Sequence, residues 1–267
     1  MLKALPILVY HSVSADPPGW IAPFAVSPAM FSAHLDAVVA SGRVPLTVSQ
    51  LADGLRGGGQ LPDRPVVITV DDGFADFADH ALPALAERKL PSTLYVTTGA
   101  LAGLRWECVL PPAQMLRPAD LAGLEAAGVE IGAHSHTHRQ LDLLSSREAG
   151  DELARSRDIL AGILGHPIRS FAYPHGYWRM RVRQLAGTVG YDSACAVGNA
   201  LCSVRDHQLA LSRLMIGACD DASVVRAWLD GSGAGVLSPQ RRVPAFAWRQ
   251  YRRAHRYVRG ARPRQTG

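Results

Sequence analysis

The stretch PVVITVDDG, residues 65–73, joins an apolar run to two adjacent aspartates and a glycine. The run has almost no polar alternation, which is typical of a parallel strand buried on both faces. Short β-rich runs recur along the chain with helix-like segments between them, at residues 6–10, 92–98, 129–134, 169–174 and 193–197. This alternation predicts an α/β fold with a parallel sheet or a (β/α) barrel. In such folds the reactive side chains lie at the C-terminal ends of the strands.

Three segments between these runs have clear helix signals. The first, residues 27–42, begins with Ser27 as N-cap and Pro28 in the first turn. The second and third, residues 117–128 and 145–165, each end at or near a glycine, which adopts the left-handed conformation that terminates many helices. In the first segment the apolar residues recur at helical spacing, at Phe31, Leu35, Val38 and Val39.

Composition places the chain among ordinary globular proteins. It has 267 residues, of which 48% are hydrophobic and 19% charged, and no apolar run approaches the roughly 18 residues of a transmembrane helix. The first apolar run leads into Tyr10 and His11 without a small-residue cleavage site. We interpret it as a strand rather than a signal peptide and expect a cytoplasmic protein. The four cysteines form no CxxC pair, which indicates reduced structural thiols.

Charge divides the chain into two regions. Nine of the 28 basic residues lie in residues 241–267, which contain no acid, whereas the preceding residues hold 19 basic and 23 acidic groups. We expect a main domain at residues 1–232 and a basic, partly helical C-terminal extension at residues 233–267. The extension can pack on the domain with its arginines in water, which we favour, or contact the anionic inner face of a membrane.

Asp71 and Asp72 directly follow the strand that PVVITV predicts. A purely structural explanation would make one of them a helix N-cap and leave the other in water, but Asp76 is better placed to begin the next helix. Neighbouring side chains of an extended chain point to opposite sides. The pair can therefore have two roles, with one carboxylate binding a metal and the other handling a proton.

The stretch IGAHSHTH, residues 131–138, places three histidines at alternate positions where another strand ends. Each buried imidazole needs partners for two ring nitrogens, and neutral imidazole is the commonest metal ligand. If the chain stays extended, all three histidines share one face; if it turns, His134 and His138 converge. Asp72 with two of the histidines would form the three-ligand arrangement of a catalytic zinc site, which keeps one position open for water.

The stretch FAYPHGYW, residues 171–178, ends a third strand, and Pro174 and Gly176 bend the chain over the same face. Aromatic side chains at this place suit stacking on a sugar ring, although a packed aromatic loop explains them equally well. The ring-bearing residues of the bend are Tyr173, His175, Tyr177 and Trp178.

These motifs together resemble the polysaccharide deacetylase family, the NodB-homology domain of carbohydrate esterases. TVDDG, residues 69–73, is similar to its first motif, TFDDG, and HSHTH, residues 134–138, is similar to its second. FAYPHG lies where the third motif, R-x-P-Y, is expected. The resemblance covers about residues 5–232. It implies an irregular (β/α) barrel of the NodB type, one divalent metal that is usually zinc, and hydrolysis of N-acetyl groups on amino sugars.

The resemblance also implies roles for individual residues. Asp71 matches the catalytic base, and Asp72, His134 and His138 match the metal ligands. His136 falls in the variable part of the second motif, so we expect it to line the pocket or support a ligand rather than bind the metal.

The third motif and the late motif both depart from the family pattern, which bears on the catalytic base and acid. Ala172 replaces the third motif's arginine, which orients the base in many members, and His175 replaces its tyrosine. In the family, a late leucine-x-histidine motif normally supplies the histidine that acts as general acid, but this chain has Arg213 at that place. A branch that resembles the poly-N-acetylglucosamine deacetylases takes its acid from a first-strand motif, and LVYHSV is similar to it, so His11 is our candidate acid, with His175 in reserve.

The remaining expectations concern substrate and partners. We expect Tyr173, His175 and Trp178 to contact the substrate, with a backbone N–H near His175 helping to hold the oxyanion. One alternative is a related amidohydrolase acting on a lipid-linked sugar, a cyclic amide or a glycosylated metabolite. The other is a non-catalytic binding module. We do not expect nucleic acid as a partner.

Overall fold

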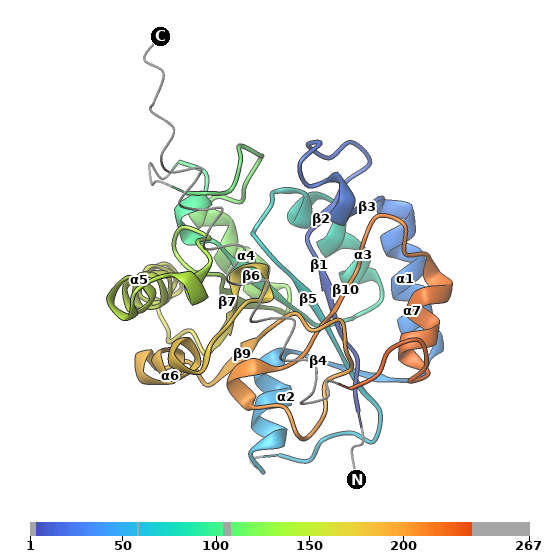
Figure 1. The fold of residues 1–267 in the computed structure, drawn as a ribbon. Helices are drawn as coiled ribbons and strands as arrows, with labels where there is room; N and C mark the ends of the chain where they lie inside the picture. The colour runs from blue at the N-terminus through green and yellow to red at the C-terminus, as the bar shows by residue number, and fades with distance from the viewer. Residues whose placement is uncertain (1–3, 58, 104–107, 237–267) are drawn as a thin grey trace. The chain divides into compact units, whose positions relative to one another are not determined.

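The computed structural model describes residues 4–57, 59–103 and 108–236, and its centre is a curved parallel sheet (Figure 1). The strands follow the order β10-β1-β5-β6-β7-β8-β9, with β4 paired to the first half of β5. Their bounds are β1 (Ile7–Tyr10), β4 (Val44–Leu46), β5 (Pro65–Val70), β6 (Ser92–Val96), β7 (Val129–Ala133), β8 (Ser170–Ala172), β9 (Ser193–Cys195) and β10 (Leu214–Met215). The six predicted strands are all present. The short β4 and β10, and the separate pair β2 (Ser12–Val13) and β3 (Ala25–Val26), were not predicted.

The two edges of the sheet are joined by the segment that leads into β10. The Leu211 N–H donates to the carbonyl of Ala194 in β9, and its carbonyl accepts from the N–H of Ala196 just after β9, each at 2.8 Å. Three residues later β10 pairs with β1, where Leu214 lies opposite Leu8. This connection links the two edges of the curled parallel sheet, and the predicted irregular (β/α) barrel is confirmed.

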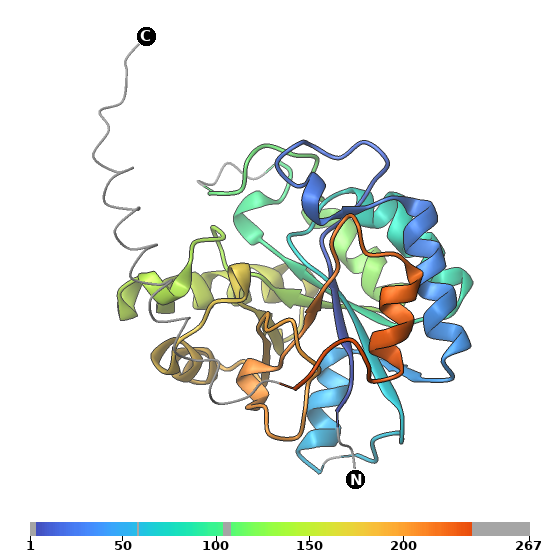
Figure 2. The ribbon, with the colours of Figure 1, turned by 45° about the vertical axis from the view of Figure 1, so that its right-hand side comes forward.

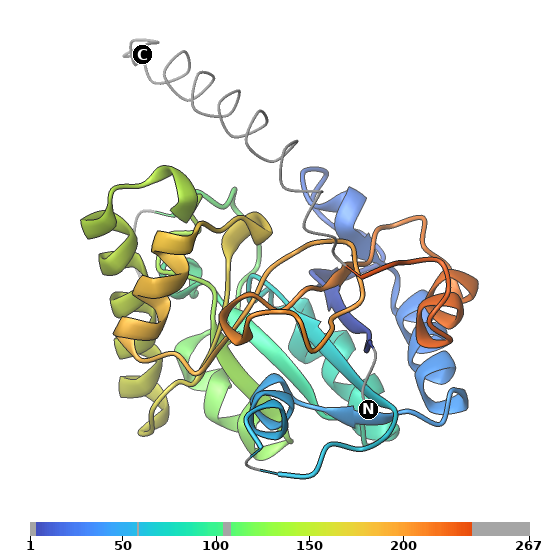
Figure 3. The same cartoon turned by 60° about the horizontal axis from the view of Figure 1, so that its bottom comes forward.

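Helices surround the sheet. Their bounds are α1 (Pro28–Ala40), α2 (Val48–Leu55), α3 (Leu82–Glu87), α4 (Leu121–Ala126), α5 (Ser146–Leu164), α6 (Met180–Val189) and α7 (Ala222–Leu229). Helices α1 and α7 lie side by side on one flank (Figure 2), and α5 and α6 form a second pair on the other (Figure 3). Shorter helical segments lie at Ala22–Phe24, Phe77–Ala81, Thr98–Ala100, Pro118–Asp120, Leu141–Leu143, Pro174–Gly176 and Gln208–Ala210.

The three predicted helices are present, and their ends have the expected chemistry. The Ser27 hydroxyl accepts from the backbone N–H of Met30, and Gly165 ends α5 with a φ of 77°. Two details differ from the prediction. Val39 is 54% exposed, so the buried face of α1 is narrower than expected. The Asp76 side chain does not cap the helix that follows it, because its carboxylate accepts from the Ser12 hydroxyl instead.

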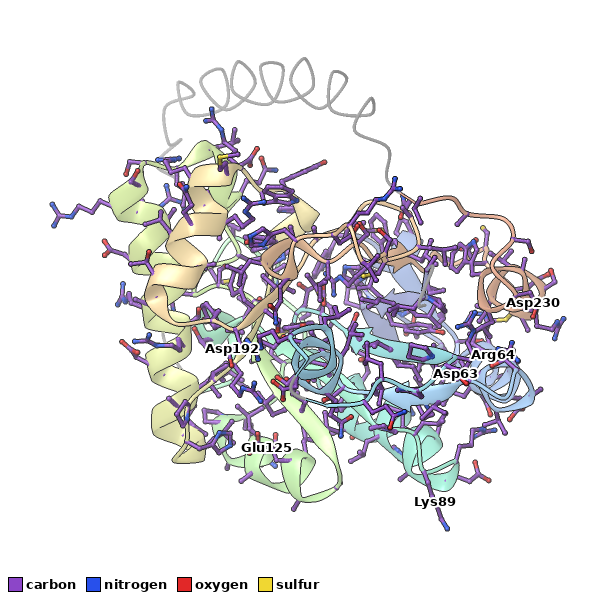
Figure 4. The ribbon with its side chains drawn as sticks, turned by 90° about the horizontal axis from the view of Figure 1, so that it is seen from below. Asp63, Arg64, Lys89, Glu125, Asp192 and Asp230 are labelled. Atoms are coloured by element: carbon purple, nitrogen blue, oxygen red, sulfur yellow. The ribbon has the colours of Figure 1, made fainter. Side chains whose placement is uncertain are left out.

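The apolar core has two layers. The larger layer fills the space between the sheet and the outer helices, and the smaller one lies inside the barrel, where α2 contributes Val48 and Leu51. The backbone N–H of Val48 donates to the Thr93 hydroxyl at the beginning of β6, so α2 covers the end of the barrel where the strands begin. The view from this end shows charged side chains on the loops that precede the strands, among them Asp63, Lys89 and Asp192 (Figure 4). The strands therefore end at the opposite side, where the predicted reactive residues lie.

Residues 233–236, which we assigned to the C-terminal extension, still contact the barrel, since the backbone N–H of Leu201 donates to the Gly235 carbonyl. The rest of the extension, including its predicted helix, lies outside the described residues. In the part of the chain that the structure describes, no helix is long and apolar enough to cross a membrane.

His34 on α1 makes stability depend on pH. Its Nε2 lies 3.0 Å from the Asp220 carbonyl, which can only accept, so Nε2 carries the proton and Nδ1 faces the Tyr10 hydroxyl at 3.3 Å. Burial lowers the pKa of His34 below its usual 6.5. Below pH 6.5 the unfolded chain therefore takes up a proton that the folded chain resists, and the free energy of unfolding falls, by at most about 1.4 kcal/mol per pH unit for this one group.

We expect His34→Gln to reduce the dependence of unfolding free energy on pH in the range just below pH 6.5. Denaturant unfolding at several pH values, with a chelator present, measures this slope for both proteins. Part of the slope should remain in the variant, because burial also lowers the pKa values of His134 and His136. An unchanged slope in the variant would show that His34 is not the group responsible.

Candidate metal centre

Three side chains with metal-binding atoms converge beyond the ends of β5 and β7. They are Asp72, two residues past β5, and His134 and His138, in the chain that follows β7. All three are buried, and one ligand atom from each lies within 4.8 Å of the others. The structure thus brings together the three residues that we predicted as ligands.

The backbone turns sharply to bring these side chains together. Asp72 has a φ of 75°, Ser135 of 63° and His138 of 61°. These left-handed values are uncommon for residues other than glycine and occur often at functional sites. Because the chain turns after β7 and does not stay extended, His138 folds back until its ring centroid lies 5.0 Å from that of His134.

The hydrogen bonds and charges of this cluster fit a divalent metal. The Nδ1 of His134 donates to the Ala172 carbonyl at 2.9 Å, and burial lowers the pKa of His134 to about 4, so its Nε2 presents a lone pair. Asp72 Oδ1 lies 3.5 Å from His134 Nε2 and 3.1 Å from His138 Nε2. That oxygen is nevertheless buried without a well-formed hydrogen bond. An acceptor set of one carboxylate and two imidazoles, one of them fixed by a backbone carbonyl, is typical of zinc sites.

Asp71 lies beside this cluster and pairs with Arg213. The guanidinium of Arg213 donates to both carboxylate oxygens of Asp71 at 2.7 Å, and also to the Thr69 hydroxyl. Both partners are buried, and Arg213 is fully so. Burial alone would raise the pKa of Asp71, but the charge of Arg213, followed by that of His134, lowers it below its usual value. Asp71 therefore stays ionised 3.8 Å from His134 Nε2.

His11 lies at the end of β1, close enough to the two carboxylates to contribute to the low pKa of each. Its side chain is half-buried, and its Nδ1 is buried without a hydrogen-bond partner. Its ring centroid lies 5.6 Å from that of Phe24, which is 40% exposed. On another side of the cluster, the exposed His175 lies edge-on against His138 with ring centroids 4.8 Å apart.

Comparison with known proteins identifies the family. A sequence profile described as polysaccharide deacetylase matches residues 58–194, a range that includes the aspartate pair and the three histidines. The chain belongs to the polysaccharide deacetylase family. It is also 24% identical over 226 residues to YxkH of Bacillus subtilis (strain 168), whose name describes it as a polysaccharide deacetylase, and the match covers 85% of this chain and 76% of YxkH.

Solved structures of deacetylases share the fold. The Streptococcus pyogenes deacetylase PplD, solved in complex with acetate, has a TM-score of 0.74 at 23% identity, and the match covers 84% of this chain and 96% of PplD. IcaB from Ammonifex degensii has a TM-score of 0.73 at 26% identity, with 85% of this chain and 97% of IcaB covered. The predicted resemblance and the NodB-type barrel are thus confirmed.

Not every residue predicted for this deacetylase's substrate site lies where expected. Tyr173 is fully buried, and its hydroxyl donates to the Leu209 carbonyl, so its position does not support a substrate contact. The reason is that Tyr173 lies on the same side of the sheet as Phe171 and joins the core layer under the outer helices before the chain bends. Trp178 is half-buried and packs on the core, with the Arg183 guanidinium 5.4 Å from its ring centroid.

The bend itself depends on Gly176. Its φ is 71°, and a Cβ there would lie 2.4 Å from the Val197 side chain, so only glycine fits. The middle histidine of the second motif, His136, is buried with its Nδ1 2.9 Å from the Thr98 hydroxyl. His136 is not among the three residues whose ligand atoms cluster, as expected for a residue that lines the pocket or supports a ligand.

Sequence reasoning missed two residues of the site. Arg213 was noted only as a departure from the late motif, although its guanidinium binds both carboxylate oxygens of Asp71. Its isolated charge in the apolar stretch LSRLMI was the available signal, because a fully buried arginine needs an acidic partner. No sequence signal indicates that Phe24 lies beside His11. Phe24 directly precedes β3, a two-residue strand that the sequence pattern does not predict.

Proposed function

We propose that this polysaccharide deacetylase removes N-acetyl groups from an amino-sugar glycan or glycoconjugate with the help of one divalent metal, for which zinc fits the ligand set best. Family membership supports deacetylation of a carbohydrate. The observation that carries the proposal is the buried Oδ1 of Asp72, which faces two imidazole nitrogens without a well-formed hydrogen bond. A cation would satisfy all three groups at once.

The metal would be held by Asp72, His134 and His138. When bound, it supplies Lewis-acid activation of a water molecule and of the acetyl carbonyl. Cleavage of an amide also needs a base for the water's proton and an acid for the departing nitrogen, and these tasks belong to the protein's own side chains.

Asp71 would accept the proton of the attacking water. It is ionised, and Arg213 holds both of its oxygens in fixed directions. The guanidinium therefore keeps the carboxylate charged and oriented before the substrate arrives, which is the kind of preorganisation that favours general base catalysis.

His11 would donate a proton to the sugar nitrogen as the C–N bond breaks, giving acetate and a free amine. It lies at the end of β1, close to both carboxylates of the candidate centre. His175 is the alternative donor because it also lies at the metal centre, against His138. The exposed Phe24 beside His11 offers a ring for stacking on a sugar.

Arg213→Lys tests the role of the arginine. Lysine keeps the positive charge but cannot hold both carboxylate oxygens, so we expect the base to be misplaced and kcat/KM to fall by about 10²-fold. The acid limb of the pH profile should also move to higher pH, because burial then raises the pKa of Asp71 with less opposition.

Arg169→Lys is the matched control for this experiment. Arg169 also binds an aspartate, Asp53, through two nitrogens, but it is 41% exposed and precedes β8 at the opposite end of the barrel. We expect the Arg169→Lys variant to have the same kcat/KM and the same pH profile as the wild type. A normal profile in Arg213→Lys would show that Arg213 has no part in orienting the base.

The proposed reaction is tested by acetate and free-amine analysis after incubation with N-acetylated sugars, from a monosaccharide conjugate to a chito-oligomer, and with cyclic and lipid-linked amides. Release of equal amounts of acetate and amine from an acetylated sugar supports the proposal, and the preferred chain length identifies the substrate class. Free amino groups formed only from the cyclic or lipid-linked amides would favour the related amidohydrolase function.

A further inference from the structure

The segment from His134 to His138, called here the ligand turn, cannot hold its own shape. Two of its residues, Ser135 and His138, have left-handed backbone conformations although neither is glycine. Within the turn, the His138 N–H donates to the Ser135 hydroxyl at 3.0 Å. Strained backbone of this kind persists only when its surroundings fix it.

The strongest external support comes from Glu152 on α5. One carboxylate oxygen, Oε2, accepts from the backbone N–H of His136 at 3.0 Å and from that of Thr137 at 2.8 Å. The other oxygen, Oε1, accepts from the Thr137 hydroxyl. Glu152 is only 7% exposed, so these bonds are largely protected from competition with water. All of its donors belong to the part of the turn between the two predicted histidine ligands.

The opposite side of the ligand turn is held by the loop that follows β6. The Gly99 N–H donates to the His136 carbonyl at 2.7 Å, and the Thr98 N–H donates to the Ser135 carbonyl at 3.3 Å. The turn is thus fixed by its carbonyl groups on one side and by its N–H groups on the other. The bonds to the two N–H groups come from one side chain, Glu152, so a single substitution can remove them.

We propose that Glu152 is a positioning residue for the metal centre: by binding two consecutive N–H groups of the ligand turn, it sets the angle at which His134 and His138 face Asp72. The proposal rests on the metal site described under Proposed function. A substitution of Glu152 should therefore change how tightly the protein holds a metal, beyond any change in stability.

Glu130 provides a matched control within the same chain. Its carboxylate also accepts from one backbone N–H and from two hydroxyls, those of Ser49 and Thr93. These contacts anchor α2 at the end of the barrel where β7 begins, away from the ligand turn. Glu130→Ala should thus remove a comparable set of hydrogen bonds without affecting the ligands.

The experiment measures the affinity for Zn²⁺ by competition with a chelator, the visible absorption of the Co²⁺ form, and the denaturant stability of each metal-free protein. We expect Glu152→Ala to lose about 10- to 100-fold in metal affinity and to show an altered Co²⁺ spectrum. Glu152→Gln keeps one accepting oxygen and should lose less. Glu130→Ala should be destabilised with wild-type metal affinity and spectrum.

Glu152→Ala with wild-type metal affinity and spectrum would overturn the proposal, as would an equal loss of affinity in Glu130→Ala. If Glu152→Ala does not fold, Glu152→Gln and Thr137→Val decide the question by the same readouts. A wild-type protein that binds no metal would overturn the proposed function and this inference together, so the two kinds of failure are distinguishable.

Discussion

His134→Ala is expected to lose the bound metal and the release of acetate together. His134 would supply one of three protein ligands. Its Nδ1 donates to the Ala172 carbonyl, which leaves Nε2 oriented to bind the metal. Without it, a carboxylate and one imidazole remain, which is too few for a stable site of the zinc type. Metal content of the purified protein and acetate release from an N-acetylated sugar measure the two effects.

His136→Gln is the control for this substitution. His136 lies two residues away, is equally buried and bonds to Thr98 through Nδ1, yet it is outside the cluster of ligand atoms. We expect this variant to retain its metal. Full metal content and turnover in His134→Ala would mean that the ligand assignment is wrong.

Asp71→Asn is expected to keep the metal but to lower the rate by about 10²- to 10⁴-fold, the usual contribution of a general base. Asparagine has the same shape and can still accept one hydrogen bond from Arg213, but it cannot take a proton from water. Removing this charge also leaves the buried Arg213 without its counter-ion, so we expect a loss of stability.

The measurement for Asp71→Asn compares metal stoichiometry, kcat and unfolding midpoint with those of the wild type. Assays run well below the midpoint separate lost chemistry from lost folding. Unchanged kcat in a metal-loaded variant would assign the base to another group, and loss of the metal would place Asp71 among the ligands.

Much of the barrel could be predicted from local sequence patterns. Uninterrupted apolar runs such as residues 65–70 mark strands buried on both faces, and the residues that end them must lie at one side of a parallel sheet. This logic grouped Asp72, His134 and His138, which the structure brings together. Their roles, and that of His11, stay predictions because proximity alone does not show chemistry.

The parts that could not be predicted depend on contacts between distant segments. Arg213 and Asp71 are 142 residues apart in the chain, and nothing local indicates that they pair. Tyr173 belongs to a motif but is directed into the core by its strand. The contacts of the ligand turn with Glu152 and with the loop after β6 join distant segments, and no pattern within the turn reveals them.

The most direct test of the account is to strip the wild-type protein of metal, titrate Zn²⁺ back, and follow metal uptake and acetate release from an N-acetylated sugar in the same samples. We expect no release without metal, and release that rises in proportion to occupancy until about one metal is bound per chain. Full acetate release from metal-free protein, or none from protein that has taken up its metal, would contradict the account.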